Sequence, residues 1–371
     1  MRILHINCNY IGTALHQLLI EKLDALGYDN KVFAPTYNKN LAVIVPRENV
    51  IVSECFKKWD RLIFDYKQKK IFKAVEDNYN IKNFDVIHAY TLFTDGNCAR
   101  KLSEKYGVPY VVAIRNTDVN SFFRLMPHLR KRGVKTMLGA KAVFFLSESY
   151  RKQIFDKYVP KKYHEILKSK TYIIPNGIDD FWFNNPPVDE NKIGDTIKLI
   201  YAGRIDRNKN IPTTQKAMSI LREKGYKVSL TVVGKVADKK LFNEIKADPW
   251  TQCISAMPKE KLITLYRENN IFVMPSFTES FGLVYVEAMS QGLPVVYSKG
   301  QGFDCQFDEG TVGYHVDASN VDNVEEGIQK ILVCFNDIKK NVVSSAQKYN
   351  WREIASIYSK IYIAINGESA I

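Results

Sequence analysis

The chain has 371 residues, of which 46% are hydrophobic and 25% charged, as in an ordinary globular protein with room for two domain cores. Its 53 Lys and Arg against 40 Asp and Glu give a net charge of +13, which favours anionic partners such as phosphates, nucleic acid or a membrane surface. No apolar run approaches the roughly 20 residues that span a bilayer, and the six scattered cysteines argue against a disulfide framework or a metal site. We therefore expect a cytoplasmic protein.

Strand and helix patterns alternate through the first half of the chain. Residues 2–8 form the first expected strand rather than a secretory signal, and residues 13–26 form a helix with leucines on one face. Further strands are expected at residues 31–34, 86–89, 110–114 and 143–146. This alternation predicts a parallel sheet covered by helices, whose ligands bind at the carboxyl ends of the strands.

Five residues at these strand ends are candidates for a ligand site. They are Gly12, His88, Asp95, Arg115 and Asp118. Each also has a purely structural explanation, because an aspartate can cap a helix and a histidine can be a core or surface residue with satisfied hydrogen bonds.

A Pro-Asn-Gly turn at residues 175–177 ends a strand and is followed by a polar, proline-containing stretch over residues 184–196. We place the domain boundary here, with a first domain over residues 1–180 and a second over 181–350. The second half alternates again, with strands expected at residues 197–202, 228–233, 252–256 and 271–274. Residues 351–371 form a last segment, in which a helix over 351–365 has an apolar face.

The stretch from 274 to 302 carries the sharpest chemical signal. We expect a helix that begins near Phe281, with N-cap chemistry from Thr278, Glu279 and Ser280. Free backbone N–H groups at such a helix start bind anions. Glu279 and Glu287 flank it, and carboxylates beside an anion site suit the hydroxyls of a sugar or ribose. Either glutamate alone could be a cap or a surface residue.

Together these residues resemble a known signature. Pro275-Ser276, residues 279–283, Glu287-Ala288 and residues 292–296 are similar to the Glu-x7-Glu motif of the retaining, nucleotide-sugar-dependent glycosyltransferases of family 4. The resemblance implies the α/β GT-B fold, in which two Rossmann-like, doubly wound domains face a central cleft and the C-terminal helix crosses back to the N-terminal domain. The run at 175–179 also resembles the family's interdomain connection.

A basic pair follows the first strand of the second half. Gly203 and Arg204 come directly after this strand, and Lys209 lies five residues beyond Arg204. Such side chains can converge on a diphosphate, although a solvated basic loop is the alternative. The run resembles the family's donor-phosphate pair. Cations there would stabilise charge on the leaving phosphate. We find no convincing Asp-x-Asp site, so we expect no metal and no cofactor.

The resemblance also implies roles on the donor side. Glu279 would orient the donor sugar, and Glu287 would bind the ribose, in a front-face retaining substitution. The start of the helix would bind the donor through its backbone. Gly234, at the next strand end, would admit the nucleotide. The donor-binding residues are therefore Gly203, Gly234, Ser280, Phe281, Gly282 and Leu283.

On the acceptor side the chain departs from the family. Gly12 stands alone where relatives carry a Gly-Gly loop, and residues 115–118 stand where many relatives carry a histidine. Asp118 would take the polar role of that histidine, and Arg115 would meet a phosphate. His88 and Asp95 are further acceptor-side candidates.

Three basic stretches lie in the first domain, over residues 56–72, 130–132 and 157–170. The first interleaves aromatic residues and cations, as helices at an anionic bilayer surface do. A helix with its aromatic residues in the core and its lysines in water is an equal alternative. The membrane hypothesis fits a lipid-linked acceptor and a peripheral location on the inner face of the plasma membrane.

Three functions are therefore compared. The first is a retaining transferase that moves a sugar from a nucleotide sugar, with a UDP-sugar as the first candidate, to a saccharide or lipid-linked acceptor in bacterial surface polysaccharide assembly. This function explains the Glu-x7-Glu stretch. A nucleic-acid-binding protein would explain the charge alone, and no DNA- or RNA-binding motif supports it, so no nucleic acid partner is expected. A GT-B sugar-nucleotide epimerase would convert its donor without an acceptor.

Overall fold

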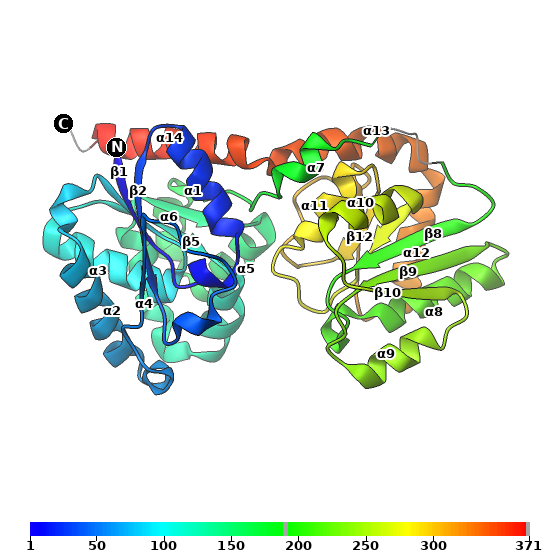
Figure 1. Ribbon diagram of the computed structural model, residues 1–371, viewed down its shortest axis with the longest axis horizontal. Helices are drawn as coiled ribbons and strands as arrows, with labels where there is room; N and C mark the ends of the chain where they lie inside the picture. The colour runs from blue at the N-terminus through cyan, green and yellow to red at the C-terminus, as the bar shows by residue number, and fades with distance from the viewer. Residues whose placement is uncertain (188–191, 369–371) are drawn as a thin grey trace. The chain divides into compact units, whose positions relative to one another are not determined.

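The computed structural model describes residues 1–187 and 192–368, which divide into two compact units (Figure 1). Unit 1 comprises Met1–Gly177 and Trp351–Ile371, and unit 2 comprises Ile178–Asn350. The division falls after Gly177, close to the boundary expected at residue 180. Residues 188–191 of the proline-containing stretch and residues 369–371 of the last segment lie outside the described residues.

Unit 1 is built on a parallel sheet of seven strands in the order β3-β2-β1-β4-β5-β6-β7. Its strands are β1 (Arg2–Ile6), β2 (Asp29–Pro35), β3 (Val50–Ser53), β4 (Val86–Ala89), β5 (Tyr110–Ile114), β6 (Ala142–Phe145) and β7 (Thr171–Ile173). Ile3 of β1 pairs with Asn30 on one side and Val86 on the other. The strand order reverses between β1 and β4, which is where sheets of this kind bind ligands.

Helices cover both faces of this sheet. They are α1 (Leu15–Ala25), α2 (Phe64–Asn78), α3 (Asn97–Tyr106), α4 (Arg130–Gly139), α5 (Glu148–Tyr158), α6 (His164–Lys168) and α14 (Trp351–Glu368). Successive strand residues point to opposite faces. Ile87 of β4 therefore joins the core under α2 to α5, whereas Val86 joins the core under α1 and α14.

The last helix packs on unit 1, as expected. Trp351, Ile354 and Tyr358 of α14 are buried against β1, β4 and β5, and the Tyr28 hydroxyl lies 2.6 Å from Ser359 Oγ. Not every apolar residue of the helix lies on this packed face, because Ile357 is exposed.

Unit 2 holds a second parallel sheet, of six strands in the order β10-β9-β8-β11-β12-β13. Its strands are β8 (Ile197–Ala202), β9 (Val228–Gly234), β10 (Thr251–Ser255), β11 (Ile271–Val273), β12 (Val295–Ser298) and β13 (Gly313–Val316). Its helices are α7 (Asp180–Asn184), α8 (Ile211–Glu223), α9 (Lys239–Lys246), α10 (Lys259–Glu268), α11 (Leu283–Ser290), α12 (Val321–Val333) and α13 (Phe335–Ala346). The strand order reverses between β8 and β11, so the expected pair of Rossmann-like domains is confirmed.

Across the described residues, none of the helices combines the length and the apolar character needed to cross a membrane.

Candidate functional site

Two loops of unit 2 meet beyond the carboxyl ends of β8 and β11. The Asn208 side chain accepts the N–H of Thr278 at 3.0 Å and donates to the carbonyl of Thr278 at 2.8 Å. The backbone N–H of Phe277 donates to the Asn208 carbonyl at 2.9 Å. These bonds fix the loop that carries Lys209 against the loop that carries Glu279. The role of Asn208 was not foreseen, because an asparagine in a loop has no distinctive sequence pattern.

Lys209 and Glu279 form an ion pair. The Lys209 ammonium lies 2.5 Å from Glu279 Oε2, and both side chains are largely buried. The other carboxylate oxygen accepts the N–H of Ser280 at 3.0 Å, and the Glu279 N–H donates to Gln301 Oε1 at 2.9 Å. Glu279 is therefore fixed in orientation by three partners. The sequence motif predicted both charged residues as site residues, and the structure brings them into contact.

Arg204 lies on the same edge but in a different environment. Its side chain is 64% exposed and donates from Nε to Asp206 Oδ2 at 2.5 Å. Asp206 Oδ1 also accepts the backbone N–H of Lys209 at 3.1 Å. Asp206 thus connects the two basic residues, a link that the sequence analysis did not anticipate.

The helix after Glu279 begins later than expected. Helix α11 starts at Leu283, and its N-cap is Gly282 with a φ of +76° and no side-chain cap. The prediction of capping by residues 278–280 was therefore wrong, because the chain turns through a left-handed glycine instead. A Cβ at Gly282 would lie 2.4 Å from the Tyr285 ring, so no other residue fits. Within the described part of the chain, the N–H groups of Gly282 and Leu283 have no backbone acceptor.

Glu287 lies on α11 and is partly buried beside Asp179 and Lys259 of unit 2. Burial and the nearby Asp179 carboxylate raise the pKa of Glu287 to about 7. The Lys259 ammonium pairs with the Asp179 carboxylate at 2.5 Å, so these two neighbours of Glu287 are held together. Binding of ribose by Glu287 stays a prediction.

Gly203 and Gly234 are adjacent at the ends of β8 and β9. A Cβ at Gly234 would lie 1.7 Å from the Gly203 carbonyl oxygen, so close backbone packing alone requires this glycine. The nucleotide contact that the sequence suggested is not needed to explain Gly234. Phe281, another predicted donor-binding residue, buries its side chain against Phe303 and Tyr349, which leaves only its backbone for a ligand.

Asp118 of unit 1 is a fully buried anchor. Its carboxylate accepts the N–H groups of Leu92, Phe93 and Arg115 at 2.9 to 3.2 Å. Burial raises the pKa of Asp118 to about 6, against the effect of these three bonds. Both oxygens are occupied by backbone donors, so the structure accounts for Asp118 without the sugar contact that was expected.

Arg115 stands at the carboxyl end of β5. Its guanidinium donates to the Tyr90 carbonyl at 3.2 Å and to Asn176 Oδ1 at 2.9 Å. Both partners are uncharged, and the Arg115 charge also acts on the nearby Asp118 carboxylate. This arrangement holds the side chain in place at the end of the strand.

His88 is a core residue, which differs from its expected place on the acceptor side. It is fully buried on the face of β4 that α14 covers, with Nδ1 2.6 Å from the Tyr362 hydroxyl and its ring stacked on Tyr90. Burial lowers the pKa of His88 well below its ordinary value, so the ring is neutral. Strand alternation points this side chain away from the helices that face Ile87.

Asp95 and Gly12 remain at the carboxyl edge of the sheet. Asp95 is buried, accepts the Cys8 N–H at 3.1 Å and the Thr91 hydroxyl at 3.0 Å, and has its pKa raised to about 7 by burial. Lys67 of α2 donates to Thr94 at 3.3 Å in the same region. No atom would lie within 4 Å of a Cβ at Gly12, so packing does not require this glycine.

Comparison with known proteins gives the family. Residues 185–348 match the family model "Glycosyl transferases group 1", and residues 17–180 match "Glycosyltransferase Family 4". A D-inositol 3-phosphate glycosyltransferase of Pseudarthrobacter chlorophenolicus is 26% identical over 76% of this chain and 71% of its own length.

Solved structures share the fold. The sucrose-phosphate synthase of Thermosynechococcus elongatus superposes with a TM-score of 0.77 at 20% identity, over 99% of this chain and 100% of the synthase. Anabaena HepE in complex with UDP and glucose superposes with a TM-score of 0.67 at 16% identity, over 98% of this chain and 100% of HepE. With both halves of the chain matched, the protein belongs to the family-4, group 1 glycosyltransferases of GT-B fold.

Proposed function

We propose that the protein is a retaining glycosyltransferase that moves a sugar from a nucleotide sugar, with a UDP-sugar as the first candidate, to a saccharide or lipid-linked acceptor. The observation that carries this proposal is the ion pair of Lys209 and Glu279 at the carboxyl edge of unit 2, with Arg204 beside it. The binding of UDP and glucose by HepE, a neighbour of the same fold, supports the choice of donor.

The departing nucleoside diphosphate accumulates negative charge as the glycosidic bond breaks. Lys209 has two ammonium protons beyond the one that faces Glu279, and the exposed Arg204 has four N–H donors beyond the one that faces Asp206. Together with the N–H groups of Gly282 and Leu283, these donors would stabilise the transition state more than the ground state. We propose that they carry the charge without a divalent metal and without a cofactor.

Glu279 has a positioning task in this scheme. Its carboxylate is held by Lys209 and by the N–H of Ser280, and its remaining lone pairs can accept hydroxyl groups of the donor sugar. We propose a front-face substitution in which the leaving phosphate helps to deprotonate the acceptor hydroxyl. Glu287 would bind the ribose, and Arg115 would meet a phosphate on the acceptor.

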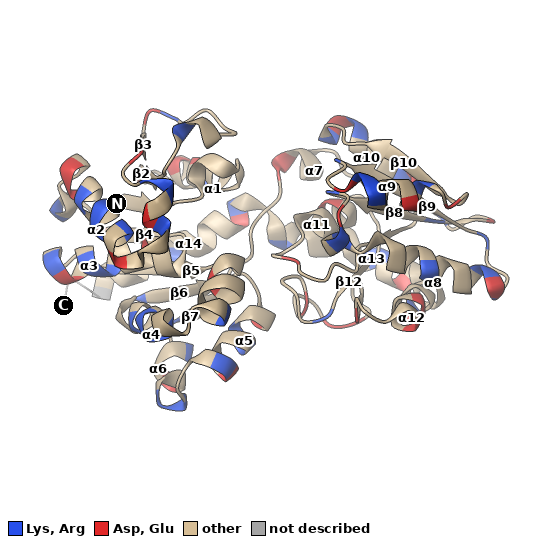
Figure 2. Cartoon of the chain, turned by 90° about the horizontal axis from the view of Figure 1, so that it is seen from below, with Lys and Arg blue, Asp and Glu red and all other residues tan. Residues whose placement is uncertain are grey.

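A membrane-bound acceptor is the second part of the proposal. The tip of unit 1 between Phe56 and α2 exposes Trp59 (77%), Leu62 (78%) and Ile63 (63%) to solvent. Lys57, Lys58 and Arg61 are exposed among them, and Figure 2 shows further Lys and Arg on α2, α4 and α6. Apolar residues interleaved with cations suit the interface of an anionic bilayer. We propose a peripheral location on the inner face of the plasma membrane, in polysaccharide assembly.

A thermal-shift panel of UDP, GDP, ADP, CMP and their sugars, without added metal, tests the donor site. A ligand of the native state raises the melting temperature by mass action, and we expect UDP and one UDP-sugar to do so selectively. Loss of the shift in Lys209→Met would assign it to this site. If no nucleoside diphosphate shifts the melting temperature, the proposal fails. Conversion of the donor without an acceptor would instead indicate an epimerase. Salt-dependent binding of mixed DNA would indicate a nucleic-acid-binding protein.

A further inference from the structure

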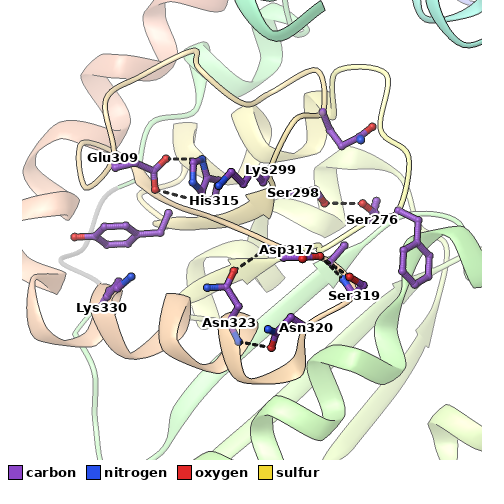
Figure 3. A pocket seen from close by; sticks show the side chains of 14 residues that line it. Ser276, Ser298, Lys299, Glu309, His315, Asp317, Ser319, Asn320, Asn323 and Lys330 are labelled. Atoms are coloured by element: carbon purple, nitrogen blue, oxygen red, sulfur yellow. Dashed lines mark hydrogen bonds and ion pairs between the residues drawn. The ribbon is translucent and has the colours of Figure 1, made fainter. Parts of the chain in front are cut away.

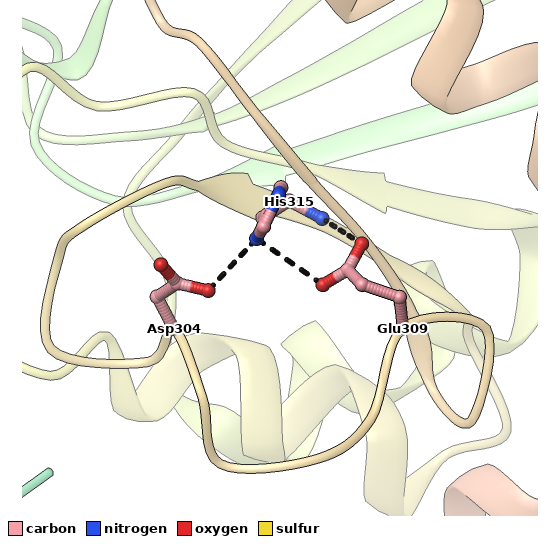
Figure 4. Close-up of side chains that lie close together, drawn as sticks. All are labelled: Asp304, Glu309 and His315. Carbon is pink, nitrogen blue, oxygen red and sulfur yellow. Dashed lines mark hydrogen bonds and ion pairs between the residues drawn. The ribbon is translucent and has the colours of Figure 1, made fainter. Parts of the chain in front are cut away.

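Three potential metal ligands converge in unit 2, away from the Lys209–Glu279 pair (Figure 4). His315 of β13 points its Nδ1 between two carboxylates, 2.9 Å from Asp304 Oδ1 and 3.3 Å from Glu309 Oε1. All three ligand atoms lie within 4.8 Å of one another. Asp304 is buried, His315 is partly buried and Glu309 is exposed.

Other groups hold both carboxylates in orientation. Asp304 accepts the N–H of Gly300 at 2.6 Å through Oδ2 and the N–H of Cys305 at 3.0 Å through Oδ1. Glu309 accepts the His315 N–H at 3.0 Å through Oε2 and the Tyr297 hydroxyl at 2.9 Å through Oε1. Outer hydrogen bonds of this kind orient the ligands of metal sites.

A single imidazole nitrogen faces two anionic oxygens here. At most one proton can lie on Nδ1, so one N–H has to serve two carboxylates, and a neutral ring with its lone pair at Nδ1 would repel both. A cation between the three atoms satisfies all of them at once. Ligand atoms about 2.1 Å from a tetrahedral Zn²⁺ lie about 3.4 Å apart, and the two separations from His315 Nδ1, 2.9 Å and 3.3 Å, are close to this value.

The cluster also borders open space. Glu309 and His315 line a cavity of about 1020 Å³ together with polar residues that follow β11, β12 and β13 (Figure 3). A cation held by three side chains therefore has room for water at its remaining coordination positions.

We infer that Asp304, Glu309 and His315 bind a divalent transition-metal ion, with Zn²⁺ as the first candidate because imidazole nitrogen and carboxylate oxygen are both zinc ligands. The ion joins β13 to the loop over residues 299–312. The same loop carries Gln301, whose side chain accepts the N–H of Glu279. Metal binding therefore stabilises the loop that supports Glu279, without the ion entering the transfer reaction.

The experiment is a calorimetric titration of the full-length protein with ZnCl₂ after removal of metal by EDTA and dialysis. We compare the wild type with His315→Ala, and with His128→Ala as a matched control that removes an exposed histidine of unit 1. We expect one ion per chain, binding at least about tenfold weaker in His315→Ala, and no change in His128→Ala. Circular dichroism checks that each variant is folded.

Glu309→Gln provides a second test, because Glu309 is exposed and its removal leaves the core intact. We expect it to weaken Zn²⁺ binding and to reduce the metal-dependent rise in melting temperature of the wild type. Absence of binding by the stripped wild type overturns the inference. Binding by His315→Ala or Glu309→Gln as tight as in the wild type overturns it equally, since the metal then lies elsewhere. A failed donor panel leaves this result unaffected.

Discussion

The Lys209 ammonium and the Glu279 carboxylate lie 2.5 Å apart although 70 residues separate them in the chain. Each was expected from the sequence to serve a different part of the donor, the lysine its phosphate and the glutamate its sugar. Their contact makes them one electrostatic unit, in which each side chain balances the charge of the other and fixes its orientation in a largely buried place.

Lys209→Ala should therefore lower both turnover and stability. The loss of the ammonium removes the proposed phosphate contact and the cation beside the largely buried Glu279 carboxylate, which costs on the order of 1–3 kcal/mol. Urea unfolding and steady-state kinetics measure the two effects. The double variant Lys209→Met, Glu279→Gln is the control: it should regain most of the stability and none of the turnover. Wild-type stability in Lys209→Ala would contradict the coupling.

Arg204→Ala should lower turnover without a loss of stability. Its side chain is 64% exposed, and an ion pair such as that with Asp206 contributes about 0–1 kcal/mol, whereas a donor aimed at developing charge contributes about 10²-fold or more to kcat. Arg207→Ala is the matched control and should retain turnover. It removes another exposed arginine of the loop that carries Arg204, one that pairs with Asp238. Turnover of Arg204→Ala at the wild-type level would remove this residue from the mechanism.

The stability difference between the wild type and Asp95→Asn should become smaller as the pH rises. Burial raises the folded-state pKa of Asp95 from 3.8 to about 7, so between these values the folded protein keeps a proton that the unfolded chain has released. The stability contributed by this group is present at low pH and is lost as the pH rises to about 7. Urea unfolding at pH 5 and pH 8 should show a change of about 3 kcal/mol in the difference between variant and wild type. A difference independent of pH would mean that Asp95 has an ordinary pKa.

Trp59→Ser combined with Leu62→Ser should weaken binding to anionic vesicles. Both side chains are more than three-quarters exposed, and their insertion into the bilayer interface is the apolar part of the proposed membrane contact. We expect at least about a tenfold loss in co-sedimentation with the vesicles, and no change in the donor-induced thermal shift. Val333→Ser, which removes an exposed apolar residue of unit 2, is the control. Equal vesicle binding by wild type and double variant would remove the tip of unit 1 from the membrane proposal.

The central strands of both sheets could be predicted because they are buried on both faces and form continuous apolar runs. The edge strands β3 and β13 were not foreseen. All four residues of β3 are only partly buried, so its sequence is less distinctive than that of β4 or β5.

The candidate site was harder to predict than the fold for two physical reasons. A carboxylate that binds backbone N–H groups, such as Asp118, has the same sequence signature as one that binds a ligand, and only the three-dimensional partners distinguish them. The face of β4 on which His88 lies is covered by α14, and this contact joins residues 274 positions apart. Local sequence patterns carry no information on such pairs.

The placement of α14 also determines the order in which the molecule can be completed during synthesis. The apolar face formed by β1, β4 and β5 receives Trp351, Ile354 and Tyr358 as its cover, and these residues leave the ribosome after every residue of unit 2. A nascent chain that already contains the first sheet therefore holds an uncovered hydrophobic surface while some 170 residues of unit 2 are translated, for on the order of 10 s or more. We therefore expect fragments that end before residue 351 to expose this surface and to aggregate more readily than the whole chain.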